Sequence, residues 1–260
     1  MEPRPFLETR YRVHVANRPD ADHWSGGPAY HRGARCPVCK IPLLLLWDIN
    51  CTDPRFPRRK FGPLERVPLY FCWACVSDLS YQVIDDKRIR LFRGLRGEGP
   101  TFPYEPYPES FERRPLALDD GRPEGILQLV RMIYASIGDD NAPEPTARDR
   151  QTLKHFFGHP VLTEFCTIHH QLGGKPLSLY WAMEVFRCPN PDCGGDATRK
   201  APKKPRALKF LAGVLNDPGR GLPMVEPATQ QTKKDWNYFV SVQFHICDRC
   251  WTVYACNRSD

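Results

Sequence analysis

The chain contains the stretch Cys36-Pro37-Val38-Cys39, and a similar close pair of cysteines occurs at three further places. The four pairs form two sets, one in each half of the chain. Two cysteines separated by only a few residues can bind one tetrahedral metal ion, and two such pairs complete a shell of four sulfurs. We therefore predict two metal sites, with ligands Cys36, Cys39, Cys72 and Cys75 in the first and Cys188, Cys193, Cys247 and Cys250 in the second.

A shell of four thiolates leaves no open coordination position, which is typical of a structural zinc site and not of a catalytic one. We therefore expect two structural Zn²⁺ ions per chain. The sequence also lacks a P-loop, a nucleotide-binding Gly-x-Gly-x-x-Gly motif and a Gly-x-Ser-x-Gly nucleophile motif. Both observations indicate a protein that is not an enzyme.

Disulfide bonds are the alternative explanation for paired cysteines, and they require an oxidising compartment. The first residues, Met1-Glu2-Pro3-Arg4-Pro5, do not begin a secretory signal, because no long apolar segment follows them. The longest apolar run, residues 43–47, is far shorter than the roughly 18 residues that span a bilayer. We therefore expect a cytoplasmic protein with no membrane contact, in which zinc is favoured over disulfides.

Composition limits the class of partner. The chain has 260 residues, 27 prolines and a formal charge of +7. The negative charge of eight thiolates exceeds the positive charge of two Zn²⁺ ions, so the metal-loaded protein is less basic than this formal value. Its total charge therefore does not by itself indicate a nucleic-acid-binding protein.

Hydrophobic patterning predicts an α+β, β-rich fold with two zinc-ribbon halves and a few short helices. Strands are expected within 41–50, 67–75, 79–92, 236–247 and 251–256, whereas the period of 207–215 does not decide between helix and strand. Helices are expected at 123–137 and near 146–157. The predicted organisation is an N-terminal half (1–96), an acidic, proline-rich connector (97–148) and a C-terminal half (149–260).

A Gly-Gly element precedes each predicted metal site, as Gly26-Gly27-Pro28 in the first half and Gly173-Gly174 with Pro176 in the second. In each half a cysteine pair, an apolar stretch and a strand ending in a second cysteine pair then follow, as in Leu69-Tyr70-Phe71-Cys72. This order resembles the programmed-cell-death-protein-2 family and its bacterial YwqG-like relatives.

The resemblance implies a β-rich fold with an internal repeat, in which Gly26-Gly27 corresponds to Gly173-Gly174 and the Cys72/Cys75 pair to Cys247/Cys250. For the eukaryotic members of the family it also implies a chaperone-like role, holding a newly made small-subunit ribosomal protein. It implies no settled function for the bacterial relatives.

Two hypotheses about function follow. The first is a protein-interaction or chaperone-like protein whose partner is another protein. The alternative is an RNA- or DNA-binding zinc-ribbon protein that uses two basic loops, 55–60 and 199–206, to contact phosphates. The residues expected to carry that alternative are Arg58, Arg59, Lys60, Lys203, Lys204 and Arg206.

Overall fold

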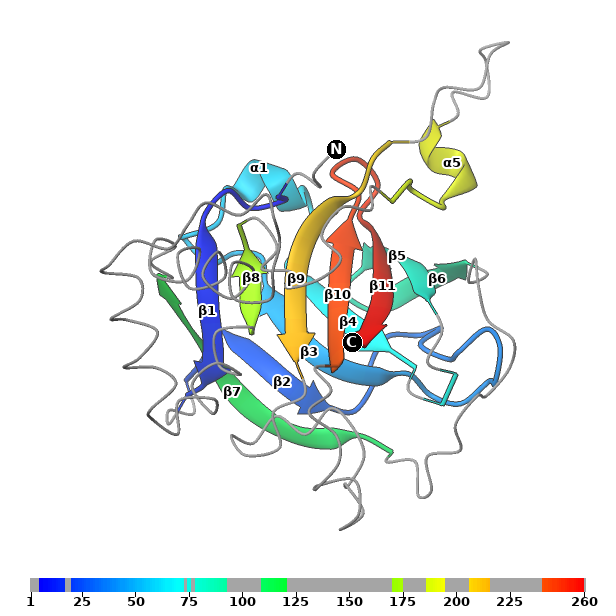
Figure 1. Ribbon diagram of the computed structural model, residues 1–260, viewed down its shortest axis with the longest axis horizontal. Coiled ribbons are helices and arrows are strands. Elements are labelled where there is room, and N and C mark those ends of the chain that lie inside the picture. Colours follow the sequence, from blue (N-terminus) through cyan, green and yellow to red (C-terminus); the bar gives the residue numbers. More distant parts are fainter. Residues whose placement is uncertain are drawn as a thin grey trace, which may run out of the picture.

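In the part of the chain that the structure describes, all strands belong to one sheet of 11 strands (Figure 1). The structure is a computed structural model that describes residues 5–16, 20–72, 74–75, 78–92, 109–120, 170–174, 186–194, 206–215 and 240–259. All pairings between these strands are antiparallel. The fold is therefore β-rich, as the sequence predicts. The expected helices at 123–137 and 146–157 lie outside the described residues.

Six strands and one short helix come from the predicted N-terminal half. They are β1 (Arg10–Val15), β2 (His23–Gly27), β3 (Leu44–Asn50), α1 (Arg58–Phe61), β4 (Arg66–Phe71), β5 (Leu79–Asp85) and β6 (Arg88–Phe92). The remaining described elements are β7 (Phe111–Asp120), β8 (Gln171–Gly173), α5 (Pro191–Gly194), β9 (Lys209–Leu215), β10 (Val240–Ile246) and β11 (Thr252–Ser259). The segment 207–215, which its sequence leaves undecided, is thus mainly a strand.

Strands from the two halves form one sheet instead of two, and the four C-terminal strands β8 to β11 lie between N-terminal strands on both sides. The order is β4-β3-β2-β7-β1-β8-β9-β10-β11-β5-β6. The first strand of the chain, β1, pairs with β7 and β8, and the hairpin β5–β6 joins the sheet through β11. Pairing therefore connects the halves twice, once at β1 and once at β5.

Residues 97–148, which we expected to form a connector, contribute a ten-residue strand to this sheet. Strand β7 lies between β2 and β1 and pairs with both. Its side chains Leu116 and Leu118 are buried in the core. All three segments defined from the sequence thus supply strands to the same sheet.

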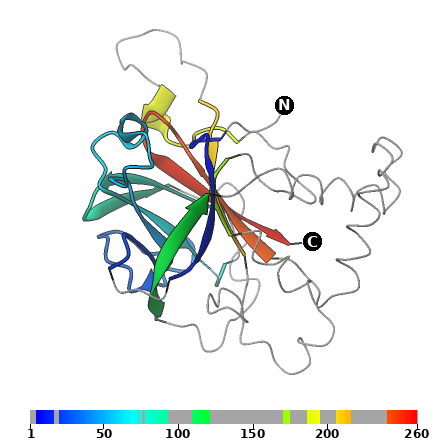
Figure 2. The ribbon, with the colours of Figure 1, turned by 90° about the vertical axis from the view of Figure 1, so that its left-hand side faces the viewer.

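The core is one large cluster of buried side chains supplied by strands of both halves, and Figure 2 shows the strands of the sheet running in widely different directions. Almost all of β3 is buried, which explains why it begins with four consecutive apolar residues, Leu44 to Trp47, instead of alternating. The ring of Trp47 on β3 lies 6.1 Å from that of His170, which immediately precedes β8. One cluster of buried side chains joins residues of both halves, including Leu44, Val67, Phe71, Leu172, Val214 and Phe244.

Candidate metal centres

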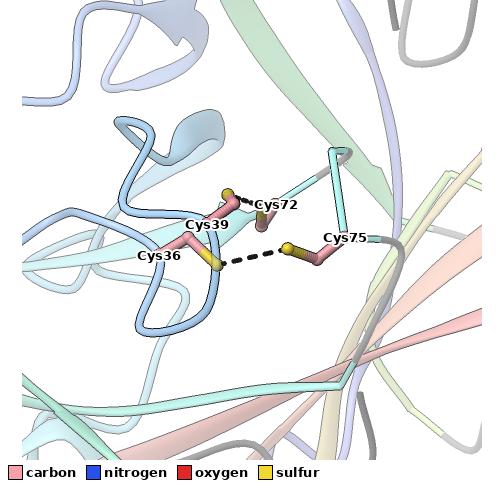
Figure 3. Close-up of side chains that lie close together, drawn as sticks. All are labelled: Cys36, Cys39, Cys72 and Cys75. Atoms are coloured by element: carbon pink, nitrogen blue, oxygen red, sulfur yellow. Dashed lines mark hydrogen bonds between the residues drawn. The ribbon is translucent and has the colours of Figure 1, made fainter. Parts of the chain in front are cut away.

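The first group of four cysteines is brought together by two turns (Figure 3). Cys36 and Cys39 lie in the connection between β2 and β3, and Cys72 and Cys75 follow the end of β4. The Sγ atoms of Cys36 and Cys75 are 3.7 Å apart, and those of Cys39 and Cys72 are 3.6 Å apart. Cys39 is the most exposed of the four, and the other three are buried.

The second group also consists of four cysteines, but they come from a short helix with its preceding segment and from a hairpin turn. Cys188 lies just before α5 and Cys193 within it, whereas Cys247 and Cys250 lie in the turn between β10 and β11. The Sγ atoms of Cys188 and Cys250 are 3.6 Å apart, and those of Cys193 and Cys247 are 3.4 Å apart. Only Cys250 is partly exposed.

These separations fit a tetrahedral metal site. A zinc–sulfur bond of about 2.3 Å places two sulfurs of a regular tetrahedron about 3.8 Å apart. The four short pairs are close to this value, and within each group all four sulfurs lie within 4.8 Å of one another. Each group could therefore hold one metal ion through four sulfurs, as the cysteine spacing predicts.

One pair in each group forms the same tight backbone turn. The N–H of Cys36 donates to the carbonyl of Ile41, and the N–H of Lys40 donates back to the carbonyl of Cys36. The second group has the same pattern: the N–H of Cys247 donates to the carbonyl of Thr252, and the N–H of Trp251 donates to the carbonyl of Cys247. Lys40 and Trp251, which follow the second cysteine of each pair, have φ values of 64° and 53°. Sequence reasoning missed this left-handed residue, because neither Lys nor Trp is typical of that conformation.

In each group, contacts between the cysteines lower the pKa of one thiol and raise the pKa of another. A hydrogen bond from Cys72 lowers the pKa of Cys36, while the hydrogen bond to Cys36 and burial raise the pKa of Cys72. In the second group, contact with Cys188 lowers the pKa of Cys250, whereas contacts with Cys247 and Cys250 raise that of Cys188. Several thiolates so close together repel one another, so a bound cation is needed to stabilise all four.

Of the residues predicted to bind nucleic acid, the structure describes Arg58, Arg59, Lys60 and Arg206, and two of these four lie within ion-pair distance of acidic side chains. Lys60 lies 3.8 Å from Glu8 and over the ring of Phe6, and Arg206 forms an ion pair with Asp248 in the turn of the second cysteine group. Arg58 and Arg59 on α1 are exposed. Lys203 and Lys204, with most of the loop 199–206, lie outside the described residues.

A buried network around Asp53 anchors the start of the loop 55–60, and no motif in the sequence predicts it. The N–H of Asn50 donates to Nδ1 of His23, so Nε2 of His23 donates to Asp53 at 2.8 Å. Asp53 also accepts hydrogen bonds from Arg55. Burial alone would raise the pKa of Asp53, but the hydrogen bonds from Arg55 and His23 lower it to about 2. Burial lowers the pKa of His23.

Comparison with protein-family models, with curated proteins and with solved structures finds no match to this chain. In the described part of the chain, no helix has both the length and the apolar character needed to cross a membrane.

Proposed function

We propose that this chain is a non-enzymatic zinc protein, with a structural Zn²⁺ ion in each group of four cysteines. The observation that carries this proposal is the closed shell of four sulfurs at tetrahedral spacing, found twice. Three of the four sulfur ligands in each group belong to buried residues, which keeps water away from the ion. Zinc in such a site stabilises the fold by an amount comparable to the stability of a whole domain, about 10–16 kcal/mol.

Metal analysis of the purified chain tests the zinc proposal. We expect two zinc ions per chain and eight thiols that react only after chelation. Cys36→Ser should lower the zinc content to one, whereas Cys51→Ser, a buried cysteine outside both groups, should leave it at two. A chain that carries almost no zinc, or fewer than eight protected thiols, would contradict the proposal.

We further propose that the protein acts by holding another polypeptide, in a protein-interaction or chaperone-like role, in the cytoplasm. The resemblance of its motif order to the programmed-cell-death-protein-2 family supports this role. The environment of the basic residues also supports it, because Arg55, Lys60, Arg66 and Arg206 lie within ion-pair distance of acidic side chains. Thiolate ligands also suit a reducing compartment.

Capture from the native host distinguishes the polypeptide from a nucleic acid. The tagged zinc-loaded chain should retain a protein that survives nuclease treatment and moderate salt, because an apolar interface depends little on ionic strength. Charge reversal at Arg58, Arg59, Lys203 and Lys204 should leave this complex intact. A salt-sensitive, submicromolar complex with RNA that is lost in that variant would establish the nucleic-acid alternative instead.

We also infer that the two halves are repeats that have exchanged their leading strands. Strands β2, β3 and β4 would correspond to β8, β9 and β10, with β1 corresponding to β7. In support, a Cβ on Gly26 would collide with the carbonyl oxygen of Glu112 on β7, and one on Gly173 with that of Thr9, just before β1. Each Gly-Gly element thus packs against the strand, or the residue just before the strand, that precedes the other Gly-Gly element in the chain. The comparison of glycine variants in the Discussion tests this inference.

A further inference from the structure

The second cysteine group contacts the first half of the chain, although all four of its ligands come from the C-terminal half. Figures 1 and 2 both place α5, the β10–β11 turn and α1 at the same end of the molecule. Asp192 on α5, next to Cys193, forms an ion pair of 2.7 Å with Arg90 on β6. Asn190 donates a hydrogen bond of 3.1 Å to Gln82 on β5.

Trp251 makes the contact with α1. It directly follows Cys250, and its Nε1–H donates to the carbonyl of Lys60 at 3.4 Å. Its indole ring lies where a side chain on Gly62 would be, because a Cβ at that position would collide with the ring. The indole therefore closes over the end of the helix that carries the exposed Arg58 and Arg59.

The conformation of Trp251 depends on the cysteine turn. Its left-handed φ of 53° is unfavourable for a bulky side chain. Hydrogen bonds between Cys247 and residues 251–252 hold it there. A metal bound by both Cys247 and Cys250 would fix the two ends of the same turn. The indole would then be held against α1 by the ligand geometry itself.

The first group also touches the other half, because Asp78, three residues after Cys75, accepts a hydrogen bond from Tyr254 on β11. Three of its cysteines, Cys36, Cys72 and Cys75, pack in the core cluster that joins both halves. Among the described hydrogen bonds, however, those of its Cys36–Lys40 turn stay within residues 34–43 and do not reach α1. The two groups therefore differ in their contact with α1.

We propose that the second cysteine group acts as a metal-dependent clasp, which keeps α1 and the β5–β6 hairpin of the first half in place. Loss of metal there releases Trp251 and Asp192, and thereby loosens α1. Loss of metal at the first group leaves the contact of Trp251 with α1 in place. The proposal rests on the zinc binding proposed above, but its contacts can be tested without removing metal.

Hydrogen exchange of the full-length, zinc-loaded chain tests the clasp at short labelling times. Trp251→Ala should speed exchange severalfold in residues 58–65, with the zinc content unchanged at two. Arg59→Ala, on the exposed face of the same helix, is the matched control and should leave exchange in residues 60–65 unchanged. Unchanged exchange of 58–65 in Trp251→Ala would overturn the proposal, whatever the ligand variants do.

Ligand variants then test the dependence on metal. Cys193→Ser should speed exchange in both 58–65 and 79–92, and Cys39→Ser should not speed exchange in 58–65. Equal loosening by the two variants would overturn the asymmetry between the groups. If Cys193→Ser does not fold, Asp192→Ala replaces it and should speed exchange in 79–92 at full zinc content. A chain without zinc would instead contradict the proposed function, while the result for Trp251→Ala would still decide the clasp contact.

Discussion

The buried pair of His23 and Asp53 makes stability depend on pH. Folding lowers the pKa of Asp53 below its unfolded value of about 3.9, so the ionised carboxylate stabilises the folded state above that pH. This contribution is lost as the pH falls toward about 2, the folded pKa. The pKa of His23 is also lowered, so stability begins to fall already below about 6.5, where the unfolded chain takes up a proton that the folded chain excludes.

We predict that Asp53→Asn destabilises the protein by about 3–5 kcal/mol at neutral pH, because it leaves the buried Nε2–H of His23 and the guanidinium of Arg55 without their carboxylate. Denaturant unfolding at several pH values measures this difference. The difference in stability between wild type and variant should narrow from about pH 4 downward, because the carboxylate of the unfolded wild-type chain takes up a proton there while that of the folded chain stays ionised down to about 2. A gap that stays constant down to about pH 3 would show that Asp53 is not the group responsible.

The glycines of the two Gly-Gly elements give a second prediction at the scale of the residue. Gly26 and Gly173 have φ values of 65° and 70°, and an added Cβ would strike a backbone carbonyl in each case. We expect Gly26→Ala and Gly173→Ala to destabilise the protein by similar amounts, more than the roughly 1–2 kcal/mol of the left-handed conformation alone.

Gly27→Ala is the matched control for this comparison. Gly27 also has a positive φ, of 90°, but the nearest atoms to an added Cβ lie at an ordinary 3.6 Å. Its cost should therefore be limited to the backbone conformation. Thermal or chemical denaturation measures all three variants. Very different costs at Gly26 and Gly173 would argue against equivalent positions in a repeat.

Strand β7 is the element whose role differs most from the sequence-based prediction, because it lies in the predicted connector but belongs to the sheet. Leu116 on β7 is 1% exposed and packs in the common core. We predict that Leu116→Ala costs about 2–5 kcal/mol, as expected for a buried leucine. Glu112→Ala, at an exposed position of the same strand, should change stability by less than about 0.5 kcal/mol. If Leu116→Ala also changed stability by less than about 0.5 kcal/mol, residues 97–148 would be better described as a connector than as part of the core.

Elements with a local signal could be predicted from the sequence. The strands β3, β5, β6 and β10 follow from apolar runs or alternation, and the two groups of four cysteines follow from cysteine spacing. Strand β7 could not be predicted, because Glu112, Arg113 and Arg114 give it a polar start and its partners β1 and β2 are remote in sequence. The contact of Trp251 with α1 could not be predicted either, because the two are remote in sequence.

At the scale of the whole molecule, the shared core bears on whether the halves unfold separately. From the sequence alone, Cys72→Ser and Cys247→Ser are each expected to destabilise mainly their own half. The core cluster, however, joins side chains of both halves, and β5 and β11 pair across them. We therefore now predict that each variant unfolds in one cooperative transition at a lower denaturant concentration than wild type.

Far-ultraviolet circular dichroism, tryptophan fluorescence and zinc release, followed along the same denaturant series, measure this prediction. Coincident transitions are expected for both variants. Cys51→Ser serves as the control that removes a buried thiol without removing a ligand. Two separate transitions in either variant would restore the description of two independent units.

The position of β1 also has a consequence for synthesis on the ribosome. β1 is made well before its two partners, and one of them, β8, is completed only when Gln171–Gly173 have been added. Until then the nascent chain carries an incompletely paired strand whose Tyr11 and Val13 are buried in the finished protein. Such distant pairing slows folding and leaves apolar surface exposed to aggregation. The four cysteines of the first group all lie within residues 36–75, so a metal bound there would close this group much earlier and would give the growing chain a compact region while β1 still lacks β8.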